Sequence, residues 1–345
     1  MISFNNESIY YDAEKGLEIF VSSSAPEGYS ELLDKVIWGT NGPQFQFFTT
    51  ESKLPYLGES IFFYLKKDNT LTTLFTVCRR ELFQGKPTFY GRHFANISKE
   101  KGLGSLLTKK AFEFASEHPL FDNHTFFAYI EEKNIKSLRV SEKFPVNICG
   151  GFKTFIYNRV FPKGIAEKIS YDRFIEHKSL IDRVNKDKLF YPKNIENRGE
   201  YWILKRSDET LALIQSFDNH WELKSYPNPL LMTLIKVFSK TPILRRVFNK
   251  TMKFISIENF YFKESSYFDE LLQGILKEKG LHHAMIHLSE ENIYDNALVN
   301  ELNYGWLYKI SGYSKSKCIY FGPNQDEDLS SNENGAIYVS GFDIG

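Results

Sequence analysis

Residues 97–107 read ISKEKGLGSLL, and this stretch decides how the chain is interpreted. The pattern predicts the end of a strand, a short cationic loop and the first turn of an amphipathic helix. Gly102 and Gly104 carry no Cβ, so the backbone there can turn tightly and approach a ligand closely. The first amides of the helix have no partner within it and point into the loop, where Lys99 and Lys101 add positive charge. The stretch therefore predicts an anion site for a phosphate or pyrophosphate.

Two common phosphate motifs do not fit this stretch. A Walker loop requires a lysine directly after its second glycine, where this chain has Ser105. A dinucleotide-binding fingerprint requires a third glycine at the position of Leu107 and an early strand–helix–strand unit. The pattern matches neither motif.

Residues 99–104, KEKGLG, resemble motif A of the GNAT superfamily of acyl-CoA-dependent N-acyltransferases, which reads [QR]-x-x-G-x-[GA]. Lys99 replaces the usual Gln or Arg, a departure that affects one side-chain contact and leaves the backbone cradle. The order of elements that hydrophobic patterning predicts over about residues 40–161 is similar to that of the superfamily. The expected elements are a hairpin over 61–78, strands at 89–97, 125–130 and 151–161, and helices over 103–118 and 134–144.

The same order recurs in the second part of the chain. The segment EEKNI at 131–135 matches SEENI at 289–293, which indicates a duplication. We therefore expect an α/β chain with mixed sheets and two GNAT-like domains, each a twisted central sheet flanked by helices. The expected limits are 1–162, 170–322 and a mobile tail over 323–345. The second set comprises a hairpin over 202–217, strands at 254–261 and 283–288, helices over 267–279 and 292–302, and closing strands over 305–313 and 317–321.

The second half lacks the glycine loop. Its equivalent segment, 262–266, reads FKESS, so side chains fill the space that a pyrophosphate needs, and Glu264 repels it. The sequence therefore predicts one acyl-CoA site, in the first half. An insertion over 229–253 carries an apolar helix face followed by basic residues. Two interpretations of this insertion are open. It is either a helix that packs on its own domain or a basic amphipathic element that contacts a membrane surface or a partner.

Composition adds limits rather than identity. The 43 basic and 43 acidic residues cancel, so no overall field favours nucleic acid. Three cysteines without zinc-ligand spacing predict no metal site and suit a reducing cytoplasm. The N-terminal segment shows no signal-peptide pattern, and no apolar run reaches the length of a membrane span. We therefore expect a cytoplasmic protein, and the oligomeric state stays open.

The resemblance also implies which residues hold the cosubstrate. In the superfamily a backbone amide of the strand before motif A contacts the thioester carbonyl, and pantetheine fills the gap where this strand separates from the next. An asparagine at the head of the following helix often binds the pantetheine arm, although the helix-capping role of such a residue is an equal alternative. The matching residues here are Ala95, Asn96, Ile97, Lys99, Lys101, Gly102, Leu103, Gly104, Ser105 and Asn134.

The acid and base are harder to assign. Many members of the superfamily have a tyrosine that acts as the acid. The matching position in this chain is Ser141, which acts at best through water. The strand before motif A contains no carboxylate, so His93 is the candidate base, its alternative being a structural histidine. Tyr157 is a substitute acid, and a further alternative is catalysis by positioning alone, with solvent taking the proton.

Three functions follow as expectations. The first is an N-acyltransferase that moves acetyl from acetyl-CoA, without a metal, to a primary amine on a small molecule or peptide. The second is a CoA-binding or interaction protein without turnover. The third is a transferase for a longer acyl chain or an aminoacyl group, for which the 31 Phe and 20 Tyr leave room. Fold analogy alone does not name the acceptor.

Overall fold

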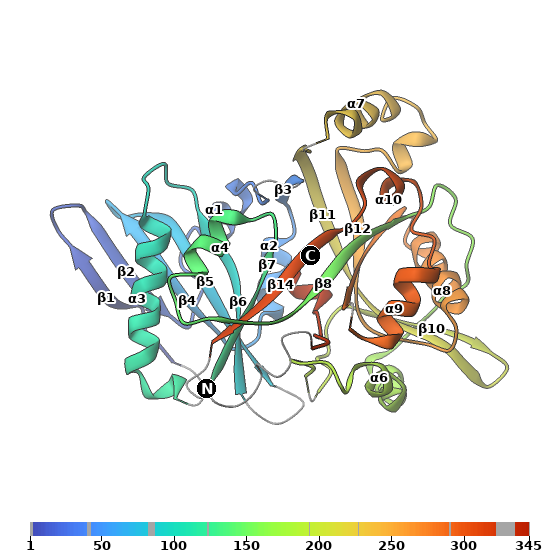
Figure 1. The fold of residues 1–345 in the computed structure, drawn as a ribbon, viewed down its shortest axis with the longest axis horizontal. Helices are drawn as coiled ribbons and strands as arrows, with labels where there is room; N and C mark the ends of the chain where they lie inside the picture. The colour runs from blue at the N-terminus through green and yellow to red at the C-terminus, as the bar shows by residue number, and fades with distance from the viewer. Residues whose placement is uncertain are drawn as a thin grey trace.

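The computed structural model describes residues 3–39, 43–81, 87–122, 124–192, 194–226, 228–289, 291–321 and 335–344. Within these ranges the chain forms one large mixed sheet of fourteen strands with helices against it (Figure 1). The predicted mixed α/β class is confirmed.

The first half follows the predicted order closely and adds two N-terminal strands that sequence patterning did not predict. In chain order its elements are β1 (Glu7–Asp12), β2 (Leu17–Ser22), α1 (Tyr29–Lys35), β3 (Gln44–Phe47), α2 (Thr50–Lys53), η1 (Leu54–Tyr56), β4 (Ser60–Lys67), β5 (Thr70–Glu81), β6 (Pro87–Asn96), α3 (Leu103–Glu117), η2 (Pro119–Phe121), β7 (Thr125–Glu131), α4 (Ile135–Ser141) and β8 (Asn147–Asn158).

Local chemistry explains where these elements turn and end. The β4–β5 hairpin turns at Asp68 and Asn69, which both have the positive φ that a tight two-residue turn requires. Helix α3 ends at Glu117 because His118 precedes Pro119, and a following proline disfavours helical backbone. Strands β1, β2, β4, β5 and β6 pair antiparallel, whereas β7 lies parallel to β6.

The second half repeats the core of this order. Its elements are β9 (Glu167–Ile169), α5 (Tyr171–Ile175), α6 (Lys178–Asn185), β10 (Glu200–Arg206), β11 (Glu209–Ser225), α7 (Pro229–Phe238), η3 (Leu244–Arg246), β12 (Thr251–Phe262), α8 (Ser265–Glu278), β13 (His283–Ser289), α9 (Ile293–Glu301), α10 (Trp306–Ser311), β14 (Ser314–Phe321) and α11 (Gly341–Ile344). Strands β10, β11 and β12 pair antiparallel, and β13 lies parallel to β12.

The two halves exchange their last strands. β14, which closes the second half, lies between β7 and β8 of the first half. β8 in turn pairs with β13, so the sheet runs from β1 to β9 through both halves (Figure 1). This corrects the expectation of a separate sheet for each half. β3 adds another link because it pairs with β11, and the domain limits at 162 and 170 stay a prediction.

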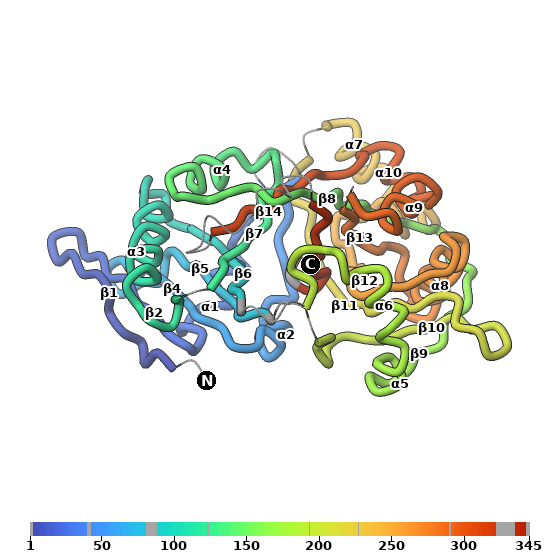
Figure 2. The backbone as a smooth tube through the Cα atoms, turned by 60° about the horizontal axis from the view of Figure 1, so that its bottom comes forward, coloured from blue at the N-terminus to red at the C-terminus, as the bar shows by residue number. Residues whose placement is uncertain are grey.

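Two further expectations are corrected by the structure. Residues 305–313 were expected to form a strand, but Trp306–Ser311 is the helix α10, which buries Leu307 beside α7. The tail was expected to be mobile, but Ile337, Tyr338 and Phe342 are buried between the halves. Figure 2 shows this C-terminal segment at the centre of the molecule. The rest of the expected tail, 323–334, lies outside the described residues.

Most of the aromatic residues pack in the cores that flank the sheet. The largest apolar cluster joins α8, α9 and the strands of the second half, and another joins α3 to β2, β4 and β6. Cys78, Cys149 and Cys318 are free and buried. Among the described residues, no helix is long and apolar enough to cross a membrane, and no group of three or more His, Cys, Asp and Glu side chains is placed to hold a metal ion.

The buried His283 makes folding stability depend on pH. Its Nε2 lies 3.0 Å from the carbonyl oxygen of Val247, and burial lowers its pKa from 6.5 to about 4. The unfolded chain takes up the proton near pH 6.5, so this stability is complete above that pH and is lost as the pH falls toward 4. Between pH 7 and pH 5 the free energy of unfolding, measured by urea denaturation, should fall by about 2 kcal/mol less in His283→Gln than in the parent. An equal loss in both proteins would contradict this assignment.

Candidate active site

A cavity of about 510 Å³ lies between the two halves. Aromatic and aliphatic side chains from both halves form most of its wall, which is typical of pockets for small molecules with a large apolar part. Representative lining residues are Phe94, Phe112 and Phe127 from the first half and Leu223, Ile235 and Met285 from the second.

The cavity lies where the parallel strands β6 and β7 separate. Their hydrogen-bonded register runs from Thr88–Thr125 to Gly91–Ala128 and stops there, although β6 continues to Asn96 and β7 to Glu131. A bulge interrupts β6 at the same level, because the register against β5 gains one residue between Arg92 and Ala95. The parted ends leave room for a chain-like ligand between two strands.

The glycine loop follows directly from the parted end of β6. Gly102 has φ +94° and precedes α3, and no side chain caps this helix by a hydrogen bond. A Cβ on Gly102 would meet no atom within 4 Å, whereas a Cβ on Gly104 would lie 3.0 Å from Cζ of Phe94, which lines the cavity. Lys99 and Lys101 are exposed. The loop therefore presents unpaired helix amides and positive charge beside the gap, as the sequence predicted.

No protein-family model matches the sequence, and no curated protein matches it. Among solved structures, N-myristoyltransferase from Saccharomyces cerevisiae with bound myristoyl-CoA matches with a TM-score of 0.57 at 8% identity, over 94% of this chain and 85% of that chain. A second structure of that protein with bound myristoyl-CoA matches with a TM-score of 0.50 at 8% identity, over 97% and 84%. The chain therefore shares the fold of these N-myristoyltransferase structures.

A GCN5-related N-acetyltransferase from Anabaena variabilis also matches, with a TM-score of 0.47 at 7% identity over 88% of this chain and 72% of that chain. The fold that the resemblance of residues 99–104 implied is confirmed by the N-myristoyltransferase structures, whose TM-scores are 0.50 and 0.57.

Asn134 and Ser141 lie on either end of α4, and both line the cavity. Asn134 caps the helix, since its Oδ1 accepts a hydrogen bond from the amide of Ser137 at 3.2 Å. The capping role is therefore observed, and a contact with a pantetheine arm stays a prediction. Ser141 donates to the carbonyl oxygen of Leu138 at 2.8 Å. Asn96 accepts from the amide of Ser98 and so shapes the start of the loop.

His93 lines the cavity, but both of its ring nitrogens are engaged. The Nε of Arg92 donates to His93 Nε2 at 2.8 Å, and the hydroxyl of Tyr29 lies 2.5 Å from Nδ1. Burial, and then the charges of Arg92 and Lys53, hold the pKa of His93 well below its usual value. With φ of +53° it is also the strained residue of the bulge. The role of base assigned to His93 stays a prediction, and this geometry does not favour it.

Tyr157 does not line the cavity, so its assignment as a substitute acid stays a prediction that this position does not favour. It lies on β8 in the core of the second half, and its hydroxyl donates to Oδ1 of Asp269 at 2.6 Å. The guanidinium of Arg159 stacks 4.1 Å from its ring centre. Burial, followed by the charge of Asp269, raises the pKa of Tyr157. The strand exchange explains the difference, because it moves β8 toward the second half.

Glu131 is a site residue that the sequence analysis did not single out. It ends β7 where β6 has already separated, and its side chain lines the apolar cavity. Burial raises the pKa of Glu131, and the charge of Lys133 lowers it to a lesser extent. Tyr226, from the second half, also lines the cavity. Burial and, to a lesser extent, the charge of Glu131 raise the pKa of its hydroxyl. The sequence signal was present, since Glu131 directly follows the predicted strand 125–130 and opens the repeated segment 131–135 that contains Asn134.

The second half has an equivalent split, and the C-terminal segment fills it. β12 and β13 pair only at Ile255–Ala284 and Ser256–Met285 before they separate. The hydroxyl of Tyr338 donates to Oε1 of Glu258 at 2.9 Å. Ser256 Oγ donates to the carbonyl oxygen of Gly341 at 2.7 Å. Residues of the C-terminal segment thus fill the split between β12 and β13, whereas the equivalent split between β6 and β7 opens on the cavity.

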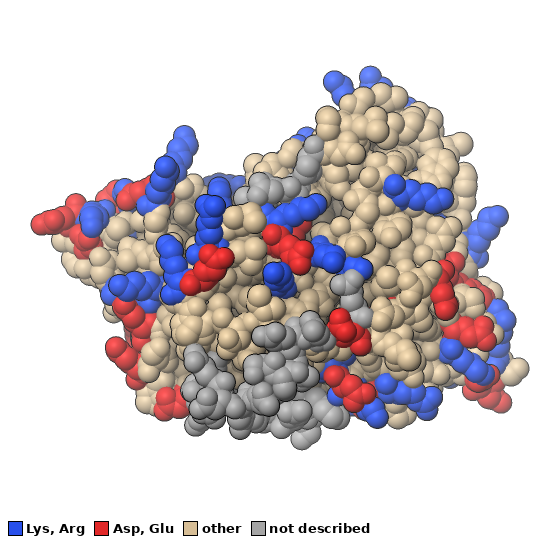
Figure 3. All heavy atoms as spheres, in the orientation of Figure 1, with Lys and Arg blue, Asp and Glu red and all other residues tan. Residues whose placement is uncertain are grey.

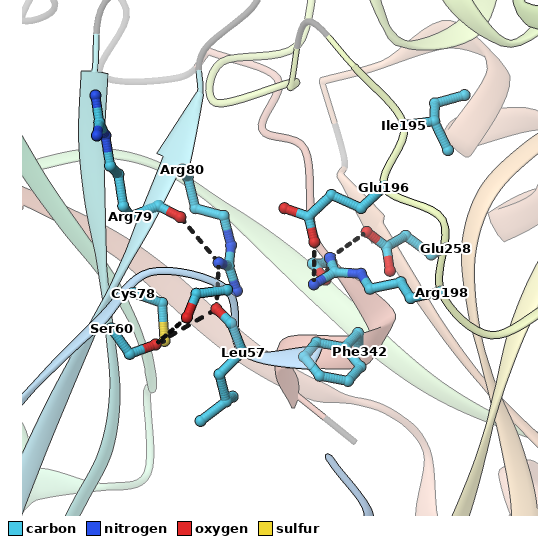
Figure 4. A network of polar contacts seen from close by, with 12 residues as sticks. Leu57, Ser60, Cys78, Arg79, Arg80, Ile195, Glu196, Arg198, Glu258 and Phe342 are labelled. Carbon is cyan, nitrogen blue, oxygen red and sulfur yellow. Dashed lines mark hydrogen bonds and ion pairs between the residues drawn. The ribbon is translucent and has the colours of Figure 1, made fainter. Parts of the chain in front are cut away.

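Buried cations hold this segment from both halves. Arg198 forms ion pairs with Glu258 at 3.2 Å and Glu196 at 2.8 Å, and its guanidinium lies 4.3 Å from the ring centre of Phe342 (Figure 4). From the first half, Lys53 Nζ and Arg92 Nη2 each donate to the carbonyl oxygen of Phe342 at 3.3 Å. The segment therefore closes one split and contacts Lys53 and Arg92, which line the cavity beside the other.

The loop allows a matched test of anion binding. Gly104→Ala and Gly104→Asp both place a Cβ against Phe94, but only Asp adds a negative charge at the first turn of α3. We expect Gly104→Asp to bind CoA at least about tenfold more weakly than Gly104→Ala, because the carboxylate repels the phosphates. Isothermal titration calorimetry with both variants measures the difference. Equal affinities would show that the phosphates bind elsewhere.

Proposed function

We propose that the chain is an acyl-CoA-dependent N-acyltransferase with a single cosubstrate site in its first half. The observation that carries this proposal is the parting of β6 and β7 directly before an uncapped helix N-terminus and beside an apolar cavity. The diphosphate of CoA would lie at the first turn of α3, the pantetheine arm between the parted strands and the acyl group in the cavity. No other feature of the described residues combines these three elements.

The apolar cavity supports a long acyl group. The sequence analysis named acetyl, but an acetyl group fills only a small part of about 510 Å³. Each buried methylene group contributes about 0.8 kcal/mol of transfer free energy, so a wall of this kind favours longer chains. We therefore propose a medium or long acyl chain as the group transferred, with a primary amine on a small molecule or peptide as the acceptor.

Glu131 suits the role of general base in this reaction. The amine nitrogen attacks the thioester carbonyl carbon, the carbon–sulfur bond breaks, and CoA leaves as a thiolate that takes a proton. The carboxylate of Glu131 takes the proton that the amine loses. A general base is most effective when its pKa lies near the working pH, and burial raises the pKa of Glu131 in that direction. Glu131 also lies on the cavity wall, at the end of β7 that has separated from β6. His93, held by Arg92 and Tyr29, would position the bulge instead.

Chain-length dependence tests the acyl site. Decanoyl-CoA should bind at least about 100-fold more tightly than acetyl-CoA, because its extra methylene groups are buried in the cavity. This ratio requires only part of the transfer free energy that these groups contribute. Ile156→Trp fills the cavity from β8 and should remove this preference while leaving CoA binding intact. Ile148→Trp, also on β8 but 45% exposed and outside the cavity wall, is the matched control and should behave as the parent. Equal affinity for both acyl-CoAs in the parent would contradict a long-chain site.

Turnover tests the base. With a panel of amines and detection of released thiol, Glu131→Gln should lower the rate by about 100-fold or more. The exposed neighbour Glu132→Gln is the control and should keep the parental rate. A base must be deprotonated, so the parental rate should rise with pH through a pKa above 4.5 and then become flat, a limb that Glu131→Gln loses. A chain that binds acyl-CoA but acylates none of the amines would favour the non-catalytic alternative.

A further inference from the structure

Residues 229–250 form a lobe that stands out from the body of the protein, and we call it the basic lobe. It consists of α7, η3 and their connections, and it inserts between β11 and β12. Figure 1 shows α7 at the outer edge of the molecule, away from the sheet. Among the described residues of the first half no equivalent element lies between β5 and β6, which only residues 82–86 separate.

The outer face of the basic lobe is apolar and exposed. Leu230 and Val237 are separated by two helical turns and therefore lie on the same face of α7. Their exposed fractions are 59% and 54%, and Ile243, in the following turn, is 51% exposed. Large aliphatic side chains at three exposed positions of one small lobe form the kind of surface that marks an interaction site.

The charge of the basic lobe has a single sign. Lys236, Lys240, Arg245 and Arg246 are all exposed, and residues 229–250 contain no Asp or Glu. The whole chain, in contrast, balances 43 basic against 43 acidic residues. In Figure 3 the lobe carries Lys and Arg spheres at its tip, with no acidic spheres on the visible face of the tip. Exposed apolar residues among cations are typical of elements that bind anionic membrane surfaces.

The inner face of the same helix lines the cavity. Leu231 and Ile235 are buried on α7, and both are part of the cavity wall together with Met252 and Leu307. One helix thus separates the apolar cavity from the apolar tip. A bilayer on the outer side would hold amphiphilic acyl donors close to this wall. Membrane binding by the lobe would therefore bring such donors near the cavity.

We propose that the basic lobe binds the surface of an anionic phospholipid bilayer, with Leu230, Val237 and Ile243 inserted among the headgroups. Lys236, Lys240, Arg245 and Arg246 contact the lipid phosphates, each strengthening binding by about fivefold. The fifth exposed cation of the lobe, Lys250, pairs with Glu222 at 2.6 Å. An acidic protein would satisfy the cations but leaves the three aliphatic side chains without an apolar environment, so the combination favours lipid. This proposal concerns binding of the protein without acyl-CoA, and it stands or fails separately from the proposed transferase activity.

Vesicle co-sedimentation of the full chain tests the proposal. Vesicles of phosphatidylcholine with phosphatidylserine should sediment the parent protein, and vesicles of phosphatidylcholine alone should do so at least about tenfold less well. The combined variant Leu230→Ser, Val237→Ser and Ile243→Ser should weaken binding to the anionic vesicles by about tenfold or more. So should the combined variant Lys240→Gln and Arg245→Gln.

The control removes equally exposed apolar residues elsewhere. Tyr11, Ile165 and Ile293 are 67%, 65% and 78% exposed, so a combined change of these three to Ser is matched in kind, and it should bind as the parent does. All substituted side chains lie on the surface, and thermal melting checks that each variant is folded. Equal binding of the control and the aliphatic variant would overturn the proposal. Binding that depends on the cations but not on the aliphatic residues would also overturn it, in favour of an acidic protein partner.

Discussion

The structure depends on one constraint, which is that parted parallel strands expose backbone amides and carbonyls that need partners. Both halves contain such a split, β6 from β7 and β12 from β13, each beside a bulge in the earlier strand. In the second half the C-terminal segment enters the split, where the hydroxyl of Tyr338 donates to the carboxylate of Glu258 and the hydroxyl of Ser256 donates to the carbonyl oxygen of Gly341. In the first half the split opens on a cavity. The duplication thus yields two equivalent places, one filled by the chain and one available to a ligand.

The strand exchange makes the cavity a site that both halves form together. Because β14 lies between β7 and β8, the wall of the cavity combines residues of both halves. The C-terminal segment connects them again, since the carbonyl of Phe342 accepts from Lys53 and Arg92 of the first half while its ring packs on Arg198 of the second. Separation of the halves would expose these buried cations, so the interface is part of the fold rather than a hinge.

Sequence patterning predicted the local elements because they depend on local chemistry. The glycines at 102 and 104, the hairpin turn at Asp68–Asn69 and the stripe of α3 each determine structure within a few residues. Partners distant in sequence were not predictable in the same way. The exchange of β8 and β14 places Tyr157 away from the cavity wall, and the buried residues 337–342 pack beside ion pairs such as Arg198–Glu258, 60 residues apart. The sequence analysis quoted Glu131 only as part of the repeated segment 131–135, and its place on the cavity wall is what suggests a role for it.

A crystal structure of the protein with decanoyl-CoA tests the central claim most directly. The account places the phosphates at the first turn of α3, the pantetheine arm between β6 and β7, and the acyl chain in the cavity between the halves, with residues 335–344 still between β12 and β13. A ligand bound between β12 and β13, or an acyl chain outside the cavity, would contradict the account.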